Sequence, residues 1–230
     1  MYKIGKYLPS DPMGDLICDN YPMLLVMSRF GIDLGFGEDT IEETCKKNGV
    51  DVYTFLSVVN VLIAEDKKII KIEFDKVSLS SLIRYLHSSH NYFLEYKLPS
   101  IRQKLIDSID GKDDASVVIV NYYDEYLAEV HKHMMYEEDT LFPYINSVIS
   151  GSGSEKYSIE VYSKHHSKVE AKLSEFKNII IKYYPAKTTN ELNNVLYDIF
   201  TCERDLASHN DIEDYLLVPT MKQLESIKRQ

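Results

Sequence analysis

Apolar residues after residue 76 recur every three to four positions, which is the spacing of amphipathic α-helices. Two loops rich in Gly, Ser or Asp, at 111–114 and 150–154, and a break at Tyr-Tyr-Pro (183–185) interrupt this pattern, so it predicts four long helices. Four helices joined by short loops favour an up-down-up-down bundle. The predicted helices cover residues 82–98 with a continuation past Pro99 to 110, residues 114–142 with an extension to 149, residues 157–182, and residues 188 through Pro219 to near the C-terminus.

The chain before residue 76 reads as a small helical unit. Residues 15–29 are mostly helical in pattern, with Pro22 as a break or a new helix start. Thr40 and Glu43 form a capping-box pattern that opens a second helix to about Asn48, and Asp51 opens a third. Charged and β-branched residues then suggest a linker. We therefore predict an all-α protein with two domains, a small helical domain over residues 1–75 and a four-helix bundle over residues 76–230.

Composition narrows the class of protein. The chain has 230 residues, 44% hydrophobic and 27% charged, as in ordinary globular proteins. Its net charge of −10 argues against a nucleic-acid partner, because phosphate binding needs an excess of Lys and Arg. No apolar run approaches the roughly 20 residues that cross a bilayer, and no secretory signal is visible. The 3 cysteines are too scattered for a disulfide framework or a thiolate zinc site, so we expect reduced thiols in a cytoplasmic protein.

One pattern occurs twice in the predicted bundle. Glu137 follows His133 by four positions, and Glu213 follows His209 by the same interval; in both copies a leucine and a proline stand eight and ten positions after the histidine. Side chains four positions apart share one face of a helix, so each copy presents an imidazole beside a carboxylate. A single copy would be an ordinary surface pair. Two matching copies, on the second and fourth helices, favour a metal site inside the bundle.

The other two helices supply further histidines. The first carries His87 and His90 and the third carries His165 and His166, whereas no histidine precedes residue 87. We predict His90 and His165 as ligands, and His87 and His166 as neighbours of the ligands or surface residues. Four imidazoles and two carboxylates suit two iron ions bridged by both glutamates and an oxide or hydroxide, with an open position; manganese or zinc suits them less. The predicted ligands are His90, His133, Glu137, His165, His209 and Glu213.

Two acidic residues are candidates to support these ligands. Glu129 precedes His133 by four positions, and Asp205 precedes His209 by four. A carboxylate one turn away can accept the second ring N–H of a ligating histidine and fix its tautomer. The alternative is that both are solvated acids on helix surfaces. For His131 we expect an exposed position.

The second domain resembles the hemerythrin-like HHE cation-binding domain, and nearly the whole chain resembles the repair-of-iron-centres family of di-iron proteins. The resemblance is carried by His-Met-Met-Tyr-Glu-Glu-Asp-Thr-Leu-Phe-Pro at 133–143 and His-Asn-Asp-Ile-Glu at 209–213, and more loosely by residues 86–99 and 164–168. In that family each His-x3-Glu helix gives one terminal histidine and one bridging glutamate. The resemblance implies these roles for the repeat, and single ligands for the histidines chosen on the other two helices.

The resemblance also implies recovery of iron–sulfur clusters after nitrosative or oxidative stress, by iron donation, nitric oxide reduction, or both, with damaged iron–sulfur proteins as partners. The first domain departs from that family, which often carries a Cys-Cys-Gly-Gly turn. This chain has Phe-Gly-Ile-Asp-Leu-Gly-Phe-Gly at 30–37 instead, so a thiol-dependent role is not expected and a bare turn or partner-docking surface is the safer interpretation.

Other functions stay open at this point. The same ligand set could bind or sense dioxygen or nitric oxide without catalysis, with the first domain relaying its state, or the metal could be structural. Hydrolysis is poorly supported, because we find no nucleophile motif and no Gly-rich phosphate loop. The acidic charge and the extra domain are compatible with a homodimer or a protein partner.

Overall fold

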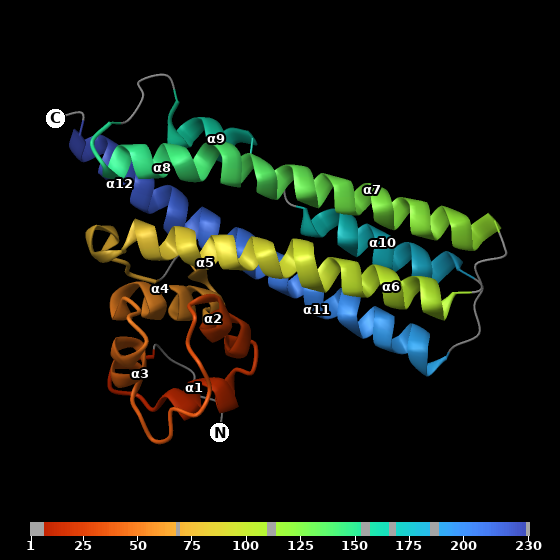
Figure 1. Cartoon of the computed structure of the whole chain (residues 1–230), viewed down its shortest axis with the longest axis horizontal. Coiled ribbons are helices and arrows are strands. Elements are labelled where there is room, and N and C mark those ends of the chain that lie inside the picture. Colours follow the sequence, from red (N-terminus) through yellow and green to blue (C-terminus); the bar gives the residue numbers. More distant parts are fainter. Residues whose placement is uncertain are drawn as a thin grey trace. The chain divides into compact units, whose positions relative to one another are not determined.

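The computed structural model describes residues 7–67, 70–109, 114–152, 157–165, 169–184 and 189–228. Within these residues the elements are helices, apart from one isolated antiparallel bridge between Pro12 and Thr40. Short helices come first and long ones follow between residues 79 and 228 (Figure 1), so the predicted all-α class is confirmed. No helix in these ranges is long and apolar enough to cross a membrane.

The short helices begin where the sequence predicts them. The Thr40 hydroxyl accepts the Glu43 N–H at 3.2 Å, and the Glu43 carboxylate accepts the Thr40 N–H at 2.9 Å, which is the predicted capping box. Asp51 caps the next helix by accepting the Thr54 N–H at 2.8 Å. Pro22 stands immediately before a helix and so starts one. These elements are α1 (Met13–Asp19), α2 (Met23–Arg29), α3 (Ile41–Lys47), α4 (Val52–Ile63) and the 3-10 turn η2 (Phe74–Lys76).

The long helices follow the predicted order and alternate in direction (Figure 1). Ser78 and Thr189 cap the first and fourth by accepting backbone N–H groups three residues on. The first comprises α5 (Leu79–Asn91), η3 (Tyr92–Lys97) and α6 (Leu98–Ser108), and the second α7 (Asp114–Tyr136), η4 (Glu137–Leu141) and α8 (Phe142–Ile149). The third is described as α9 (Ile159–His165) and α10 (Glu170–Tyr183), and the fourth comprises α11 (Asn190–Ile212), η5 (Glu213–Leu217) and α12 (Val218–Lys228).

Three prolines stand inside these long helices without ending them. Proline removes a backbone N–H and its ring clashes with the carbonyl four residues earlier, which normally kinks a helix. Here a π-helical segment precedes each one: η3 before Pro99, η4 before Pro143 and η5 before Pro219. The wider i→i+5 turn relieves the clash, so the helix runs on past the proline. The kink or new start predicted at Pro99 therefore takes the form of a widened turn.

Contacts divide the chain into two compact units. The first comprises Met1–Ser89, Phe142–Lys164 and Asp211–Gln230, and the second comprises His90–Leu141 and His165–Asn210. The predicted boundary near residue 76 stays a prediction, because the first unit also takes in later helical segments. Within that first unit, Glu225 of α12 accepts the Tyr144 hydroxyl of α8 at 2.7 Å and the Ile159 N–H of α9 at 2.8 Å.

The second unit has its own hydrophobic core. Parts of all four long helices run alongside one another there (Figure 1) and share one cluster of buried side chains. Phe176 lies at its centre, with ring centroids 5.6 Å from Tyr122 and 5.2 Å from Tyr123. The Tyr123 hydroxyl donates to the Leu98 carbonyl at 3.1 Å, and burial raises the pKa of Tyr123 far above the ordinary value.

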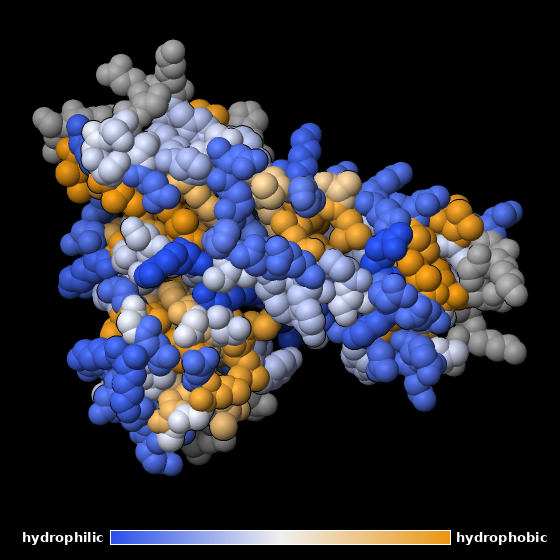
Figure 2. Space-filling model, viewed as in Figure 1, coloured by the Kyte–Doolittle hydropathy of each residue, from blue (hydrophilic) through white to orange (hydrophobic). Residues whose placement is uncertain are grey.

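Hydrophilic residues, coloured blue, cover much of the face shown in Figure 2, in keeping with the charged composition of the chain.

The capping box of α3 gives a local prediction. Thr40→Ala removes the hydroxyl that accepts the Glu43 N–H, so the start of α3 should open more easily by about 1 kcal/mol, or about fivefold faster amide exchange relative to intrinsic rates. The hydrogen bond from the Thr40 backbone lowers the pKa of Glu43, so its contribution is present above the ordinary pKa and is lost as pH falls through the lowered one. Glu43→Gln keeps an acceptor and should lose this pH dependence. Equal exchange in Thr40→Ala and wild type would contradict the assignment.

Candidate metal centre

Four buried side chains come together beside the π-helical segments. His90 is on α5, Glu137 opens η4, His209 is on α11 and Glu213 opens η5. Each offers a ligand atom, and these atoms all lie within 4.8 Å of one another. Both carboxylates have 0% exposure and both imidazoles 1%. Such a group of nitrogen and oxygen donors is a candidate metal centre.

Glu137 lies between two imidazoles. Its Oε2 is 3.1 Å from His90 Nε2, and its Oε1 is 3.2 Å from His133 Nε2. Two donors in neighbouring positions around one metal ion, with bonds of about 2.1 Å, are about 3 Å apart. Each oxygen of Glu137 therefore faces the Nε2 atom of a different histidine at a distance that fits two ligands of one metal ion.

The second histidine–glutamate pair completes the cluster. His209 and Glu213 stand one turn apart in the same helix, and the ring of His209 lies 5.0 Å from that of His90 between centroids. Phe93 packs its ring edge-on against His209 at 6.0 Å. Apolar side chains near these residues along the helices are fully buried, among them Leu141, Ile212 and Leu217.

The chemistry of these donors fits a metal cation. Burying a carboxylate in an apolar interior costs several kcal/mol unless an opposite charge is close. Imidazoles with carboxylates and no thiolate favour iron, manganese or zinc over soft-metal or all-oxygen sites. A di- or trivalent cation held by His90, Glu137, His209 and Glu213 would supply the positive charge that the two buried glutamates call for.

Local sequence explains how each pair is presented. The histidines near the ends of α7 and α11 and the glutamates four residues later project from one face of each long helix. Both glutamates are also the first residue of a π-helical segment, and the proline six positions later stands just beyond that segment's end. The repeated His-x3-Glu and the repeated proline thus belong to one local structure, a ligand pair followed by a widened turn.

The predicted ligands are partly brought together. His90, His133, Glu137, His209 and Glu213 gather as expected, and His87 is exposed on α5, which favours His90 as the ligand from the first helix. His165 is the last residue of α9, but its side chain and the whole of His166 lie outside the described residues, so the ligand of the third helix stays a prediction. His131 is exposed, as predicted.

Of the two candidate supporting acids, Glu129 has the surface position that the sequence left open as the alternative. Glu129 is half exposed and forms an ion pair with Lys172 of α10, so its carboxylate faces that amine. Asp205 is half buried one turn before His209, and its role stays a prediction. Sequence reasoning missed Glu138, whose Oε1 lies 2.6 Å from His90 Nδ1. The only sequence signal for Glu138 is its place directly after a predicted ligand.

Comparison with known families agrees with this geometry. The family model of the hemerythrin HHE cation binding domain matches residues 81–221. The chain belongs to the hemerythrin HHE family. The matched range includes the His/Glu cluster and all three π-helical segments, so the candidate metal centre lies within the cation-binding domain. A search of curated proteins found no match.

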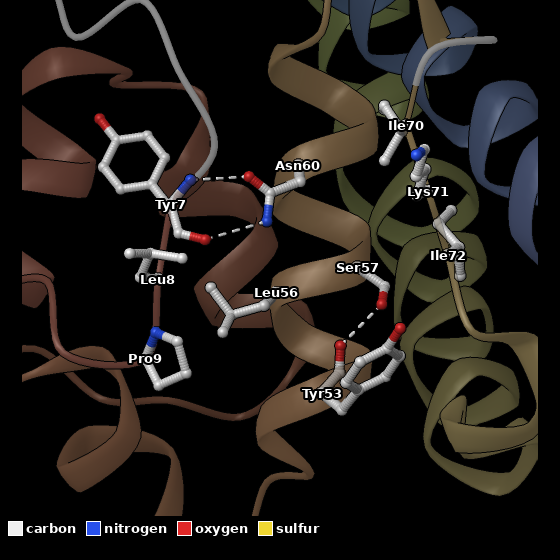
Figure 3. Close-up of a pocket in the computed structure, with 10 residues that line it drawn as sticks. All are labelled: Tyr7, Leu8, Pro9, Tyr53, Leu56, Ser57, Asn60, Ile70, Lys71 and Ile72. Atoms are coloured by element: carbon white, nitrogen blue, oxygen red, sulfur yellow. Dashed lines mark hydrogen bonds between the residues drawn. The ribbon is translucent and has the colours of Figure 1, made fainter.

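A separate small cavity lies against α4. It measures about 160 Å³ and is lined mainly by apolar side chains, including Leu8, Leu56 and Ile72 (Figure 3). Asn60 there exchanges two hydrogen bonds with the Tyr7 backbone, at 2.8 and 3.2 Å. Its side-chain amide is therefore engaged in holding residue 7, and the cavity shows no grouping of ligand or catalytic side chains.

Two pairs of variants test the ligand assignment. His133→Ala and His90→Ala each remove a nitrogen donor beside Glu137, so each should lose at least half of the bound metal. The matched controls are His131→Ala and His87→Ala, which remove exposed imidazoles from the same helices. Metal per chain, measured by mass spectrometry after reconstitution, should stay at the wild-type value in the controls. Equal metal content within either pair would refute the assignment for that helix.

Proposed function

We propose that the chain is a non-haem iron protein whose His/Glu cluster holds two iron ions. The placement of Glu137 carries the proposal, because its two oxygens face different imidazoles at 3.1 and 3.2 Å. A carboxylate so placed suits a bridge between two ions, with one histidine on each. Nitrogen and oxygen donors without thiolate favour iron, with manganese or zinc next.

The described residues would hold such a centre in two ways. His90, His133 and His209 would supply imidazole nitrogens, and Glu137 and Glu213 would supply the carboxylates shared by the two ions. Their burial among apolar side chains keeps bulk water and large anions away from the cluster. Two non-haem irons with an open position bind diatomic molecules such as nitric oxide or dioxygen and exchange electrons with them.

We infer that this chemistry serves the repair of iron–sulfur proteins under nitrosative or oxidative stress. The support is the His/Glu cluster together with the preceding helical segment, a combination that resembles the repair-of-iron-centres family. Reduction of two nitric oxide molecules to nitrous oxide and water takes two electrons and two protons, and a pair of ferrous ions holds two electrons. Iron donation to a damaged cluster is the companion activity. We place this activity in the reducing cytoplasm. The buried Cys45 fits that setting as an unreactive thiol, because burial raises its pKa to about 12.

Reversible binding or sensing of dioxygen or nitric oxide is the second candidate, and one observation favours it. Lys67, which follows α4, forms an ion pair with Asp211 and lies 5.8 Å above the Tyr215 ring. Asp211 and Tyr215 stand two residues to either side of Glu213. A shift of the Glu213 backbone on gas binding would reach the N-terminal segment through these contacts.

Metal content and an optical spectrum form the first test. Protein expressed in iron-replete medium should hold about two irons per chain with absorption from a bridged ferric pair, and Glu137→Ala should lose both. The absence of iron, or a single tightly held zinc, would rule out the redox proposal. A Glu213→Ala variant that loses metal but keeps its fold would argue against a purely structural metal.

The second test separates repair from sensing. Reduced protein is mixed anaerobically with nitric oxide, nitrous oxide is measured, and recovery of a nitric-oxide-damaged iron–sulfur enzyme is followed with and without the protein. Nitrous oxide or restored activity, lost in Glu137→Ala, is the result expected for repair. A reversible gas-bound spectrum with neither outcome would favour sensing and overturn the repair proposal.

A further inference from the structure

Both nitrogens of the His90 ring lie close to carboxylate oxygens, which belong to two consecutive residues of another helix, Glu137 and Glu138. Its Nε2 lies 3.1 Å from Glu137 Oε2, and its Nδ1 lies 2.6 Å from Glu138 Oε1. The side chain of His90 is 2% exposed and that of Glu138 is 21% exposed. Glu138 therefore reaches from the protein edge to the side of the imidazole that faces away from the metal ligands.

The π-helical turn η4 explains how Glu137 and Glu138 can both contact the His90 ring. Consecutive side chains in an α-helix diverge by about 100°, so two neighbours rarely face the same group. Glu137 and Glu138 are the first two residues of η4, where more residues share each turn and neighbouring side chains diverge less. Pro143, which follows η4, thus favours a backbone in which the carboxylates of Glu137 and Glu138 both contact the His90 ring.

The contact decides which nitrogen of His90 can bind a metal. A neutral imidazole carries one N–H and one lone pair, and the hydrogen bond made by one nitrogen fixes the role of the other. An N–H on Nδ1 that donates to Glu138 leaves the lone pair on Nε2, the nitrogen that faces Glu137. The carboxylate also makes the ring a stronger donor, because it stabilises positive charge on the imidazole.

We propose that Glu138 is the positioning residue of His90, setting the tautomer and orientation of this ligand and so strengthening metal binding. The sequence suggested the same kind of role for Glu129 beside His133 and for Asp205 beside His209. Glu138 differs from both because it acts on His90, and because it comes from a neighbouring helix, 48 positions from its histidine. The inference rests on the metal site proposed above.

Metal affinity gives the first test, with zinc as a redox-inactive probe in chelator competition. Loss of such a carboxylate partner costs 10- to 100-fold in metal affinity in other proteins, so Glu138→Ala should weaken zinc binding by about that factor. Glu138→Gln keeps an acceptor without the charge and should fall between Ala and wild type. Asp139→Asn removes a charge from the next, exposed residue and should bind zinc as wild type does.

A double-variant cycle separates positioning from a general charge effect. Once His90→Ala has removed the ring, adding Glu138→Ala should change zinc affinity by less than about twofold, because no ligand is left to position. If Glu138→Ala instead weakens binding equally with and without His90, or leaves the affinity of the otherwise wild-type protein unchanged, the proposal is overturned.

A measurement on metal-free protein distinguishes failure of the positioning role of Glu138 from failure of the proposed iron centre. Nitrogen-15 NMR of histidine-labelled, metal-free protein should find His90 with its proton on Nδ1, and Glu138→Ala should shift that proton toward Nε2 or mix the two forms. An unchanged tautomer in Glu138→Ala would overturn the positioning role even if the protein binds iron. Wild-type protein that binds no metal would refute the proposed function, whatever the tautomer.

Discussion

Burial of two carboxylates is the constraint on which the centre of this protein depends. Glu137 and Glu213 have no exposed surface, and a carboxylate in an apolar interior is tolerated only beside compensating charge and hydrogen bonds. Glu137 lies between His133 of its own helix and His90 of another, so side chains distant in sequence must be held to within a few ångströms. Aromatic packing around Phe176 and the Tyr123–Leu98 hydrogen bond provide the rigid helical core from which such ligands can be presented.

The positions of three prolines show how the sequence shapes the helices around the buried carboxylates. A proline in a helix interior normally costs about 3 kcal/mol, yet Pro99, Pro143 and Pro219 each stand just beyond a π-helical segment. Two of these segments open with the buried glutamates and the third follows His90 by two residues. Because a π-helical segment recurs at the same place in three helices and each one adjoins a candidate ligand, the widened turn belongs to the site and is not a defect of packing.

Local features of this chain could be predicted from its sequence. The caps at Thr40, Asp51 and Ser78 involve residues three positions apart, and the His-x3-Glu faces follow from helix geometry. The supporting carboxylate could not be predicted in this way. Periodicity relates Glu129 to His133 within one helix, but Glu129 pairs with Lys172 instead. The contact between Glu138 and His90 depends on how two helices pack and on a π turn, and periodicity contains neither.

The repeat also conceals a difference between its two halves. The residue after each buried glutamate is acidic, Glu138 in the first copy and Asp214 in the second. Glu138 is drawn in to within 2.6 Å of the His90 ring, whereas Asp214 is exposed and one methylene shorter. A carboxylate that accepts the second ring N–H of a histidine makes that histidine a stronger metal ligand. The first copy of the repeat therefore contributes more than a histidine–glutamate pair, because its second acidic residue lies where it can strengthen the His90 imidazole as a donor.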